Sequence, residues 1–432
     1  MDVTDLLFRA AHVAVALAVL LLLAYAGRTA ARLLRQPEVV GEVTAGLLIG
    51  PAVLALSDRA LFDALLPADV IDVLELVGQT GLVLFLVGIA HKLRSGPGGP
   101  PRQAVAALAT GAFVVPFASG LLLVGLIWLT DDTAARGDGP LPAYLLMVAV
   151  AMSITAVPVL SRILGDRGLT ESPEGRLSMA SAIVIDSIGW LLLTFAIGLG
   201  TGHLGGLGRA VGALAAGGAC ALLLRLGLRT AAARRMCRRL PRTTAVILGA
   251  AALGTAMLTE HFGMTAIIGA AMVGLAIPGD DLAPWAEPVA AVSRTGRTLT
   301  PVFFVVTGAT VLITAFTAAS WTLVVGALVL GCAGKLIGGY LGARYAGSSR
   351  RPALRTGVLM NSRGLTELIV IEAGYSAGLL PAPLVLALVV MALATTAMTG
   401  PLLQAVDRTG RRAGRPRPAP VSRTMTTEGS TR

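Results

Sequence analysis

One carboxylate stands alone in a long apolar stretch of this chain. Asp186 lies near the middle of residues 177–199, which hold no other ionisable side chain and are long enough to cross a bilayer as a helix. A charged carboxylate at that depth costs roughly 2.5–3.5 kcal/mol on insertion scales, so such groups usually face a partner or a water-filled cavity. Asp186 is therefore the first candidate for ion or proton binding. The structural alternative is a protonated acid that is hydrogen-bonded between helices.

The fifth apolar segment, about residues 141–163, is interrupted at Pro158. Proline removes an amide donor and disfavours helix at the preceding residue, so carbonyls near Thr155 lose their helical partners. A hard cation prefers oxygen ligands, and Asp186, Thr155, Ser153 and the freed carbonyls are the available set. The simpler alternative is a kink in an ordinary membrane helix.

The twelfth apolar segment contains a second polar interruption. It carries Asn361, Arg363, Gly364 and Glu367 within seven residues. Non-helical backbone at membrane depth is tolerated only inside the protein or along a cavity. If segments 1–6 and 8–13 are repeats, both interruptions fall in the fifth segment of their half, and such paired broken helices mark the binding site of a transporter. A kink accounts for one interruption but not for the pair.

The composition is that of a polytopic membrane protein. Hydrophobic residues make up 55% of the 432 positions and charged residues only 14%, against about 25% charged in an ordinary soluble domain. The net charge of +11 does not indicate nucleic-acid binding, because the arginines cluster at the ends of apolar segments. The cysteines lack metal-ligand or disulfide-framework spacing. The sequence shows no pairing of a nucleophile with a base, so we expect neither an enzyme nor a cofactor.

Thirteen apolar segments predict an all-α protein of about 13 transmembrane helices, at about 13–34, 39–56, 70–91, 104–129, 141–163, 177–199, 207–228, 243–259, 263–278, 298–319, 321–346, 354–377 and 382–404. Most of the 35 basic residues lie in the loops after odd-numbered segments and in the C-terminal tail. The positive-inside rule therefore places the N-terminus outside and the C-terminus in the cytoplasm. We expect residues 1–404 to form the transmembrane domain and residues 405–432 to be a disordered basic cytoplasmic tail, with no soluble domain attached.

Together these stretches resemble the monovalent cation:proton antiporter-2 family, within the larger group of sodium/hydrogen exchangers, over about residues 30–404. The matching stretches, in family order, are 36–51, 81–88, 153–164, 186–190, 263–270, 301–308, 334–338 and 361–367. The resemblance implies a homodimer in which interleaved dimerisation and core subdomains form an antiporter-like fold of inverted repeats with two crossing broken helices. It implies that Asp186 binds the ion, that Thr155 and the opened backbone line the site, and that Lys335 is the membrane-embedded lysine. Arg363 and Glu367 match polar residues in the second broken helix of the family.

Ile185 departs from the family pattern. Members often carry Asp, Asn or Gln just before the ion-binding acid, and in related electrogenic exchangers that acid pairs with the lysine. Lys335 therefore lacks its expected counter-ion, and two options stay open: it pairs with Asp186, or it is neutral.

A single titrating acid predicts electroneutral exchange of Na+ or K+ for a proton by alternating access across the cytoplasmic membrane. The expected partners are the transported cation at Asp186, protons, membrane lipid and a second copy of the chain. The alternative is a proton-coupled exporter of a small organic ion or antibiotic on the same scaffold.

Overall fold

The computed structural model describes residues 3–34, 36–56, 67–95, 99–137, 139–202, 205–279, 284–311 and 320–413. Within these ranges the chain consists of α-helices, their connections and one short 3-10 turn, with no strand. The predicted fold class, an all-α membrane protein with two crossing broken helices, is confirmed. The apolar segments at 141–163 and 354–377 each contain a pair of helices rather than one.

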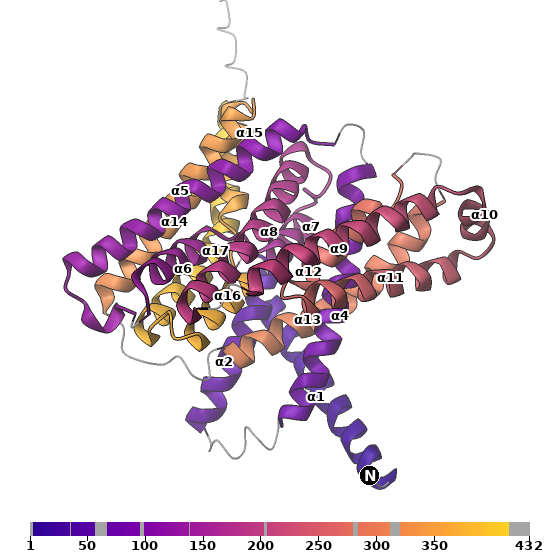
Figure 1. Cartoon of the computed structure of the whole chain (residues 1–432), viewed down its shortest axis with the longest axis horizontal. Helices are drawn as coiled ribbons and strands as arrows, with labels where there is room; N and C mark the ends of the chain where they lie inside the picture. Colours follow the sequence, from indigo (N-terminus) through magenta and orange to yellow (C-terminus); the bar gives the residue numbers. More distant parts are fainter. Residues whose placement is uncertain are drawn as a thin grey trace, which may run out of the picture.

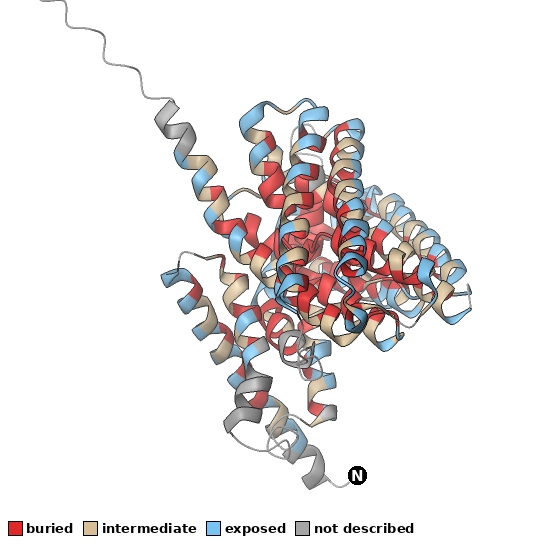
Figure 2. Cartoon of the chain, turned by 90° about the vertical axis from the view of Figure 1, so that its left-hand side faces the viewer, coloured by how far each residue is buried: buried red, intermediate tan, exposed pale blue. Residues whose placement is uncertain are grey.

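The described residues contain nine helical stretches that are long and apolar enough to cross a membrane: Arg9–Leu33, Asp69–Lys92, Arg102–Leu129, Leu141–Asp166, Pro173–Thr201, Gly205–Leu228, Pro241–His261, Trp321–Tyr345 and Ala382–Arg408. Figure 2 shows buried residues concentrated in the middle of the helix assembly and exposed ones on its outer faces. Those outer faces carry large apolar side chains such as Leu22, Leu122, Leu223 and Val246. Apolar outer faces suit a hydrocarbon surrounding, so the chain is a multi-pass membrane protein.

The helices pack in two groups. The first group contains α1 (Val3–Leu33), α2 (Glu38–Leu56), α4 (Ala68–Ser95), α9 (Gly205–Leu228), α10 (Ala231–Arg239), α11 (Pro241–His261), α12 (Ala266–Ala276) and α13 (Ala286–Val311). The second group contains α5 (Arg102–Leu129), α6 (Leu141–Ser153), α7 (Val157–Asp166), α8 (Pro173–Thr201), α14 (Trp321–Tyr345), α15 (Arg350–Met360), α16 (Leu365–Ser376) and α17 (Ala382–Ala413). Figure 1 shows α5 and α14 on one side of the molecule, α10 and α11 on the other, and α8 between them.

Two boundaries differ from the sequence prediction. The last helix, α17, continues to Ala413, so residues 405–413 are helical, and the remainder of the predicted tail, 414–432, lies outside the described residues. The basic loop before residue 243 contains a short helix, α10, which has too little apolar character to be predicted as a segment. Thr230 caps its start by accepting a hydrogen bond from the Ala233 amide.

An ion-pair cluster joins the two groups at one end of the molecule. Glu42 on α2 is fully buried and accepts a hydrogen bond from Arg28 on α1. Arg162 on α7 lies 3.5 Å from the same Glu42 carboxylate and 3.3 Å from Glu38. The charges of α1 and α2 are therefore balanced partly by a residue of the other group, at the end of the first broken helix.

Candidate functional site

The first break separates α6 from α7 at residues 154–156, all of them fully buried. Pro158 lies in the first turn of α7, where a missing amide needs no helical acceptor. The same missing amide leaves the Ile154 carbonyl without the donor that a continuous helix would supply. The backbone at Ile154 is extended, with φ −65° and ψ 146°, so the helix is broken here and not merely kinked.

The second break lies at residues 361–364, between α15 and α16, and is also buried. Gly364 has φ +154°, and a Cβ at this position would lie 2.5 Å from Val159 Cγ2 on α7. Glycine meets both the backbone conformation and the close approach, which a larger residue would not. The Arg363 amide donates a hydrogen bond to Thr396 Oγ1 at 3.0 Å, so α17 fixes this segment from behind.

The two breaks cross in direct contact. The Ala156 amide of the first break donates to the Ser362 carbonyl of the second at 3.4 Å. Asn361 also serves the crossing, because its Nδ2 donates to the Thr395 carbonyl of α17 at 3.2 Å. Unwound backbone groups of one segment are thus satisfied by the other segment and by a neighbouring helix, as buried backbone requires.

Arg363 and Glu367 form a buried ion pair beside the crossing. Both side chains are fully buried, and the Arg363 guanidinium lies 2.5 Å from the Glu367 carboxylate, one helical turn along the chain. The guanidinium also donates to the carbonyls of Met152 at 2.8 Å, Ala151 at 3.4 Å and Gly331 at 3.3 Å. Two of these carbonyls end α6, so Arg363 caps the negative end of that half-helix.

Lys335 on α14 enters the first break. Its ammonium donates to Thr155 Oγ1 at 2.7 Å, to the Ala112 carbonyl at 3.1 Å and, in a short hydrogen bond, to the Ser153 carbonyl. Among the described residues no carboxylate lies within 4.0 Å of this ammonium. The pairing of Lys335 with Asp186, one of the two options that the sequence left open, is therefore not present.

Ser153 contributes its backbone rather than its hydroxyl. Its Oγ donates to the Ala149 carbonyl, 2.6 Å away on the same helix. Its carbonyl accepts from Lys335. The Thr155 hydroxyl keeps acceptor capacity beside the lysine, because a hydroxyl oxygen has two lone pairs.

Asp186 lies on α8 one turn before the contact between α8 and the first break. The helix starts with Ser172 as its N-cap, which accepts from the Gly175 amide at 3.0 Å. Gly189 brings α8 onto the break, since a Cβ there would be 2.7 Å from Ile154 Cγ1. Asp186 is fully buried, and neither of its carboxyl oxygens has a hydrogen-bond partner among the described residues.

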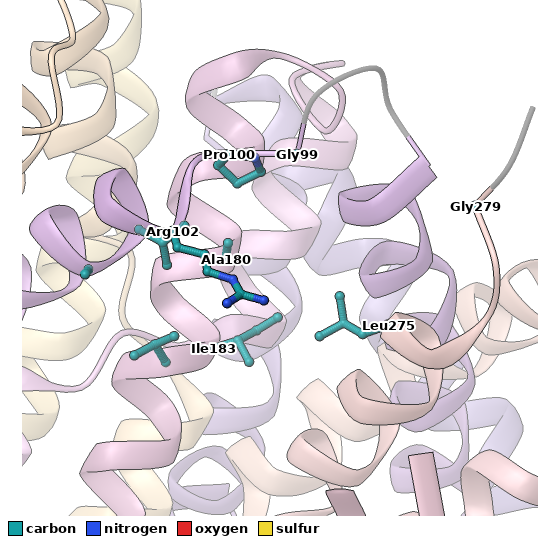
Figure 3. Close-up of a pocket in the computed structure, with 10 residues that line it drawn as sticks. Gly99, Pro100, Arg102, Ala180, Ile183, Leu275 and Gly279 are labelled. Carbon is teal, nitrogen blue, oxygen red and sulfur yellow. The ribbon is translucent and has the colours of Figure 1, made fainter. Parts of the chain in front are cut away.

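Two cavities border α8 on either side of Asp186. The first, about 820 Å³, is open to the outside and is lined by Ala180, Ile183 and Val184 of α8 and by residues of α5 and α12. Figure 3 shows the Arg102 side chain extending toward α8 in this cavity, with Leu275 on the opposite wall. The second, about 940 Å³, is lined on α8 from Trp190 to Thr201, and by Arg209 of α9 and Ala373 of α16.

The structure thus gathers the predicted residues into two places. Ser153, Thr155 and Lys335 meet at the first break, and Arg363 with Glu367 lies beside the crossing. Asp186 lies near the first break without a hydrogen bond to it in the described part of the chain. No set of three or more His, Cys, Asp or Glu residues in the described ranges could hold a resident metal ion.

Trp190 is a site residue to which sequence reasoning assigned no role. It follows Asp186 by four residues, which places both side chains on one helix face. Its indole N–H is buried, has no hydrogen-bond partner within the part of the chain that the structure describes, and neighbours the Asp186 carboxyl. The spacing of an aromatic donor one turn after a lone membrane acid was the available signal.

A family model and several known proteins match most of this chain. A family model described as "Sodium/hydrogen exchanger, transmembrane" matches residues 17–406. Cation/H(+) antiporter 18 of Arabidopsis thaliana is 32% identical over 88% of this chain and 47% of its own length. The Na(+)/H(+) antiporter NhaS4 of Synechocystis is 31% identical over 85% of this chain and 90% of its own length.

Further relatives extend the range of named ions and show the fold. K(+)/H(+) antiporter 1 of Saccharomyces cerevisiae is 28% identical over 87% of this chain and 44% of its own length. The chain thus spans less than half of the plant and yeast relatives. The sodium proton antiporter MjNhaP1 of Methanocaldococcus jannaschii superposes with a TM-score of 0.61 at 17% identity, over 96% of this chain and 100% of that chain.

Proposed function

Because the chain belongs to the sodium/hydrogen exchanger family, we propose that it exchanges a monovalent cation, Na+ or K+, for protons across the cytoplasmic membrane. The observation that carries the proposal is the state of Asp186. Its carboxyl is fully buried and has no hydrogen-bond partner among the described residues. Buried charged groups are normally paired or bind a metal ion, so an unpartnered acid between two cavities is suited to take up an ion.

Proton and cation compete for this single carboxyl. Burial disfavours the charged form of an acid, whereas a bound cation favours it, so each ligand displaces the other. An empty, charged Asp186 is costly to carry through a hydrophobic barrier, whereas the protonated and cation-bound forms are neutral. If only these neutral forms cross, uphill movement of one ion is coupled to downhill movement of the other.

The cation would be held by oxygen atoms near the first break. Asp186 supplies the charge, and the first break offers two further oxygen atoms: Thr155 Oγ1, which keeps a lone pair beside Lys335, and the Ile154 carbonyl freed by Pro158. Ser153 takes part through the carbonyl that Lys335 holds in place, because its hydroxyl is committed to Ala149. The Arg363–Glu367 pair and Gly364 fix the crossing on which this geometry depends.

The exchange is electroneutral in this proposal. Near the two breaks, Asp186 is the one acid of the described residues that lacks a partner, since Glu367 is paired with Arg363. Lys335 donates to three oxygen atoms of the protein and does not contact a carboxylate within 4.0 Å in the described ranges. We therefore assign it a structural role at the end of α6, with no proton released to the transport cycle.

The two packing groups suit alternating access. The group around α8 and the two breaks would move as the core against the group around α4 and α13, which would serve as scaffold and dimer contact. The positive-inside bias supports a cytoplasmic side for the Arg102 cavity and an outside position for the N-terminus. Residues 1–404 then form the transporter, and the homodimer and the surrounding lipid are its partners.

The test is proton movement in proteoliposomes. Acid-loaded vesicles containing the full chain receive Na+, K+ or Li+ outside, with and without a clamped membrane potential, for wild type and Asp186→Asn. We expect one or more cations to drive proton efflux that the substitution abolishes and that the clamped potential leaves unchanged. Asp186→Asn must match wild type in its elution as a folded species.

Three results would overturn parts of the proposal. A rate that follows the membrane potential would contradict electroneutrality and return Lys335 to the cycle. Full activity of Asp186→Asn would contradict the assigned acid. No response to any of the three cations by folded wild type would reject cation exchange, and a small organic cation or antibiotic, exported against protons, would then be tested in the same vesicles.

A further inference from the structure

The acid at the centre of α8 is closed off from both neighbouring cavities. Ile183, three residues before Asp186, lines the 820 Å³ cavity, and Trp190, four residues after it, lines the 940 Å³ cavity. Residues at these spacings share one helix face. Asp186 itself lines neither cavity and is fully buried, so one turn of α8 separates it from each.

The barrier on the Trp190 side is made by a large ring between the two helix groups. The Trp190 side chain packs against a buried cluster made by Ala210 and Ala213 of α9, Ile268 of α12 and Met264 just before α12. These four residues are buried and apolar, and they belong to the group of helices opposite to that of α8. The ring therefore spans the boundary along which the two groups would slide.

The polar end of the same ring faces the acid. The Trp190 Nε1–H and both oxygens of Asp186 are buried, and none of these three atoms has a hydrogen-bond partner in the described structure. The indole is nevertheless the side-chain donor beside this carboxyl. Buried donors and acceptors are seldom left unpaired, so this N–H and this carboxyl, which neighbour each other, are the available partners of one another.

We infer that Trp190 is the gate residue of the transport site: its ring closes Asp186 off from the 940 Å³ cavity, and its indole N–H donates to the Asp186 carboxylate when no cation is bound. The N–H then competes with the cation for the same oxygen atoms. The second part of this inference rests on the proposed cation exchange, whereas the first part concerns access alone.

The access role is tested by chemical labelling of Asp186, which needs no transport. Protein in nanodiscs is treated with a water-soluble carbodiimide and an amine, and the labelled Asp186 peptide is quantified by mass spectrometry. We expect Trp190→Ala to be labelled several-fold faster than wild type and Trp190→Phe to be labelled at the wild-type rate, because phenylalanine keeps a ring. Equal rates for wild type and Trp190→Ala would reject the gate.

The donor role is tested by Trp190→Phe, which removes the N–H and keeps the ring. The cation concentration for half-maximal exchange should fall by about two- to tenfold, the effect of losing one net hydrogen bond that competes with the cation. The maximal rate is measured in the same vesicles, so that a change in cation affinity is separated from a loss of folded transporter. A half-saturating concentration unchanged from wild type would reject the donor role.

Trp285→Phe is the matched control for both measurements. Trp285 is buried and its indole N–H also lacks a hydrogen-bond partner in the described structure, but it precedes α13 in the opposite helix group. We expect wild-type labelling and wild-type half-saturation from this variant.

A cation-dependent change in tryptophan fluorescence that is lost in Trp190→Phe and kept in Trp285→Phe would place the responding ring at Asp186. If wild type shows no cation response at all, the proposed function fails while the labelling result still decides the gate.

Discussion

Two buried carboxylates of this molecule, Glu367 and Asp186, differ in how their charges are satisfied. At the second break, Arg363 and Glu367 lie 2.5 Å apart, and the guanidinium also holds carbonyls of α6 and α14. Near the first break, Asp186 is equally buried and its carboxyl is bonded to nothing in the described structure. The first arrangement stabilises a fold, whereas the second leaves an acid available. Full burial therefore does not by itself distinguish a structural charge from a transporting one.

The largest expected effect on stability is at the satisfied pair. Glu367→Gln leaves the Arg363 guanidinium buried without its counter-ion, and breaking a buried pair in this way costs about 3–5 kcal/mol. Equilibrium unfolding of the detergent-solubilised protein in sodium dodecyl sulfate would measure this loss. A free energy of unfolding within error of wild type would mean that the pair does not support the crossing.

The next largest effect on stability is expected at Lys335, the lysine of the first break. Lys335→Gln removes the ammonium that donates to Thr155 Oγ1 and to the carbonyls of Ser153 and Ala112. Leaving buried acceptors unsatisfied costs about 1–3 kcal/mol, measured by the same unfolding experiment. The remaining exchange should stay independent of membrane potential, and a variant that becomes voltage-dependent would show that Lys335 takes part in charge balance.

A substitution of Gly364, the glycine at the second break, should lower the stability by a similar or smaller amount. Gly364→Ala places a methyl group 2.5 Å from Val159 Cγ2 at φ +154°, and strained backbone of this kind costs about 1–3 kcal/mol. Gly165→Ala is the matched control, because nothing lies within 4 Å of its Cβ position and it is in helix α7. The control should be neutral or slightly stabilising in thermal unfolding. Equal losses in both variants would contradict a special role for Gly364.

The smallest effect on stability should come from the acid that matters most for transport. Asp186→Asn removes a carboxyl that has no hydrogen-bond partner in the described structure, so no native bond is lost. We expect a change in the free energy of unfolding within about 1 kcal/mol, since the cost arises only when a made bond is removed. Unfolding in sodium dodecyl sulfate measures it. A loss as large as that of Glu367→Gln would show that Asp186 is a structural charge.

Much of the fold was predictable because its signals are local. Apolar segments give the helices, Pro158 and the polar run from Asn361 give the two breaks, and the isolation of Asp186 in an apolar segment gives the candidate acid. Each of these follows from neighbouring residues in the chain. The crossing of the breaks was implied by the family resemblance, and the Ala156–Ser362 contact bears it out.

The partners of the buried cations were not predictable from the sequence. Lys335 binds the Ser153 and Ala112 carbonyls, which lie 182 and 223 positions away along the chain, and Arg363 binds carbonyls of α6 more than 200 positions away. Every residue has a carbonyl group, so the sequence does not show which carbonyls a buried cation binds. A lysine or arginine that caps a half-helix therefore cannot be told from the sequence apart from one that pairs with a carboxylate. Trp190 was missed for a related reason, because its position between two helix groups depends on α9 and α12.

The short distance between the two cavities has an electrical consequence. From Ile183 to Trp190 the helix rises only about 10 Å, whereas the hydrocarbon core of a bilayer is about 30 Å thick. If water and ions fill both cavities, most of the membrane potential falls across this part of α8. Charging and discharging of Asp186 would then take place inside a concentrated electric field. Binding of a cation to the empty, charged Asp186 would then move charge through this field, whereas replacement of a proton by a cation from the same cavity would not.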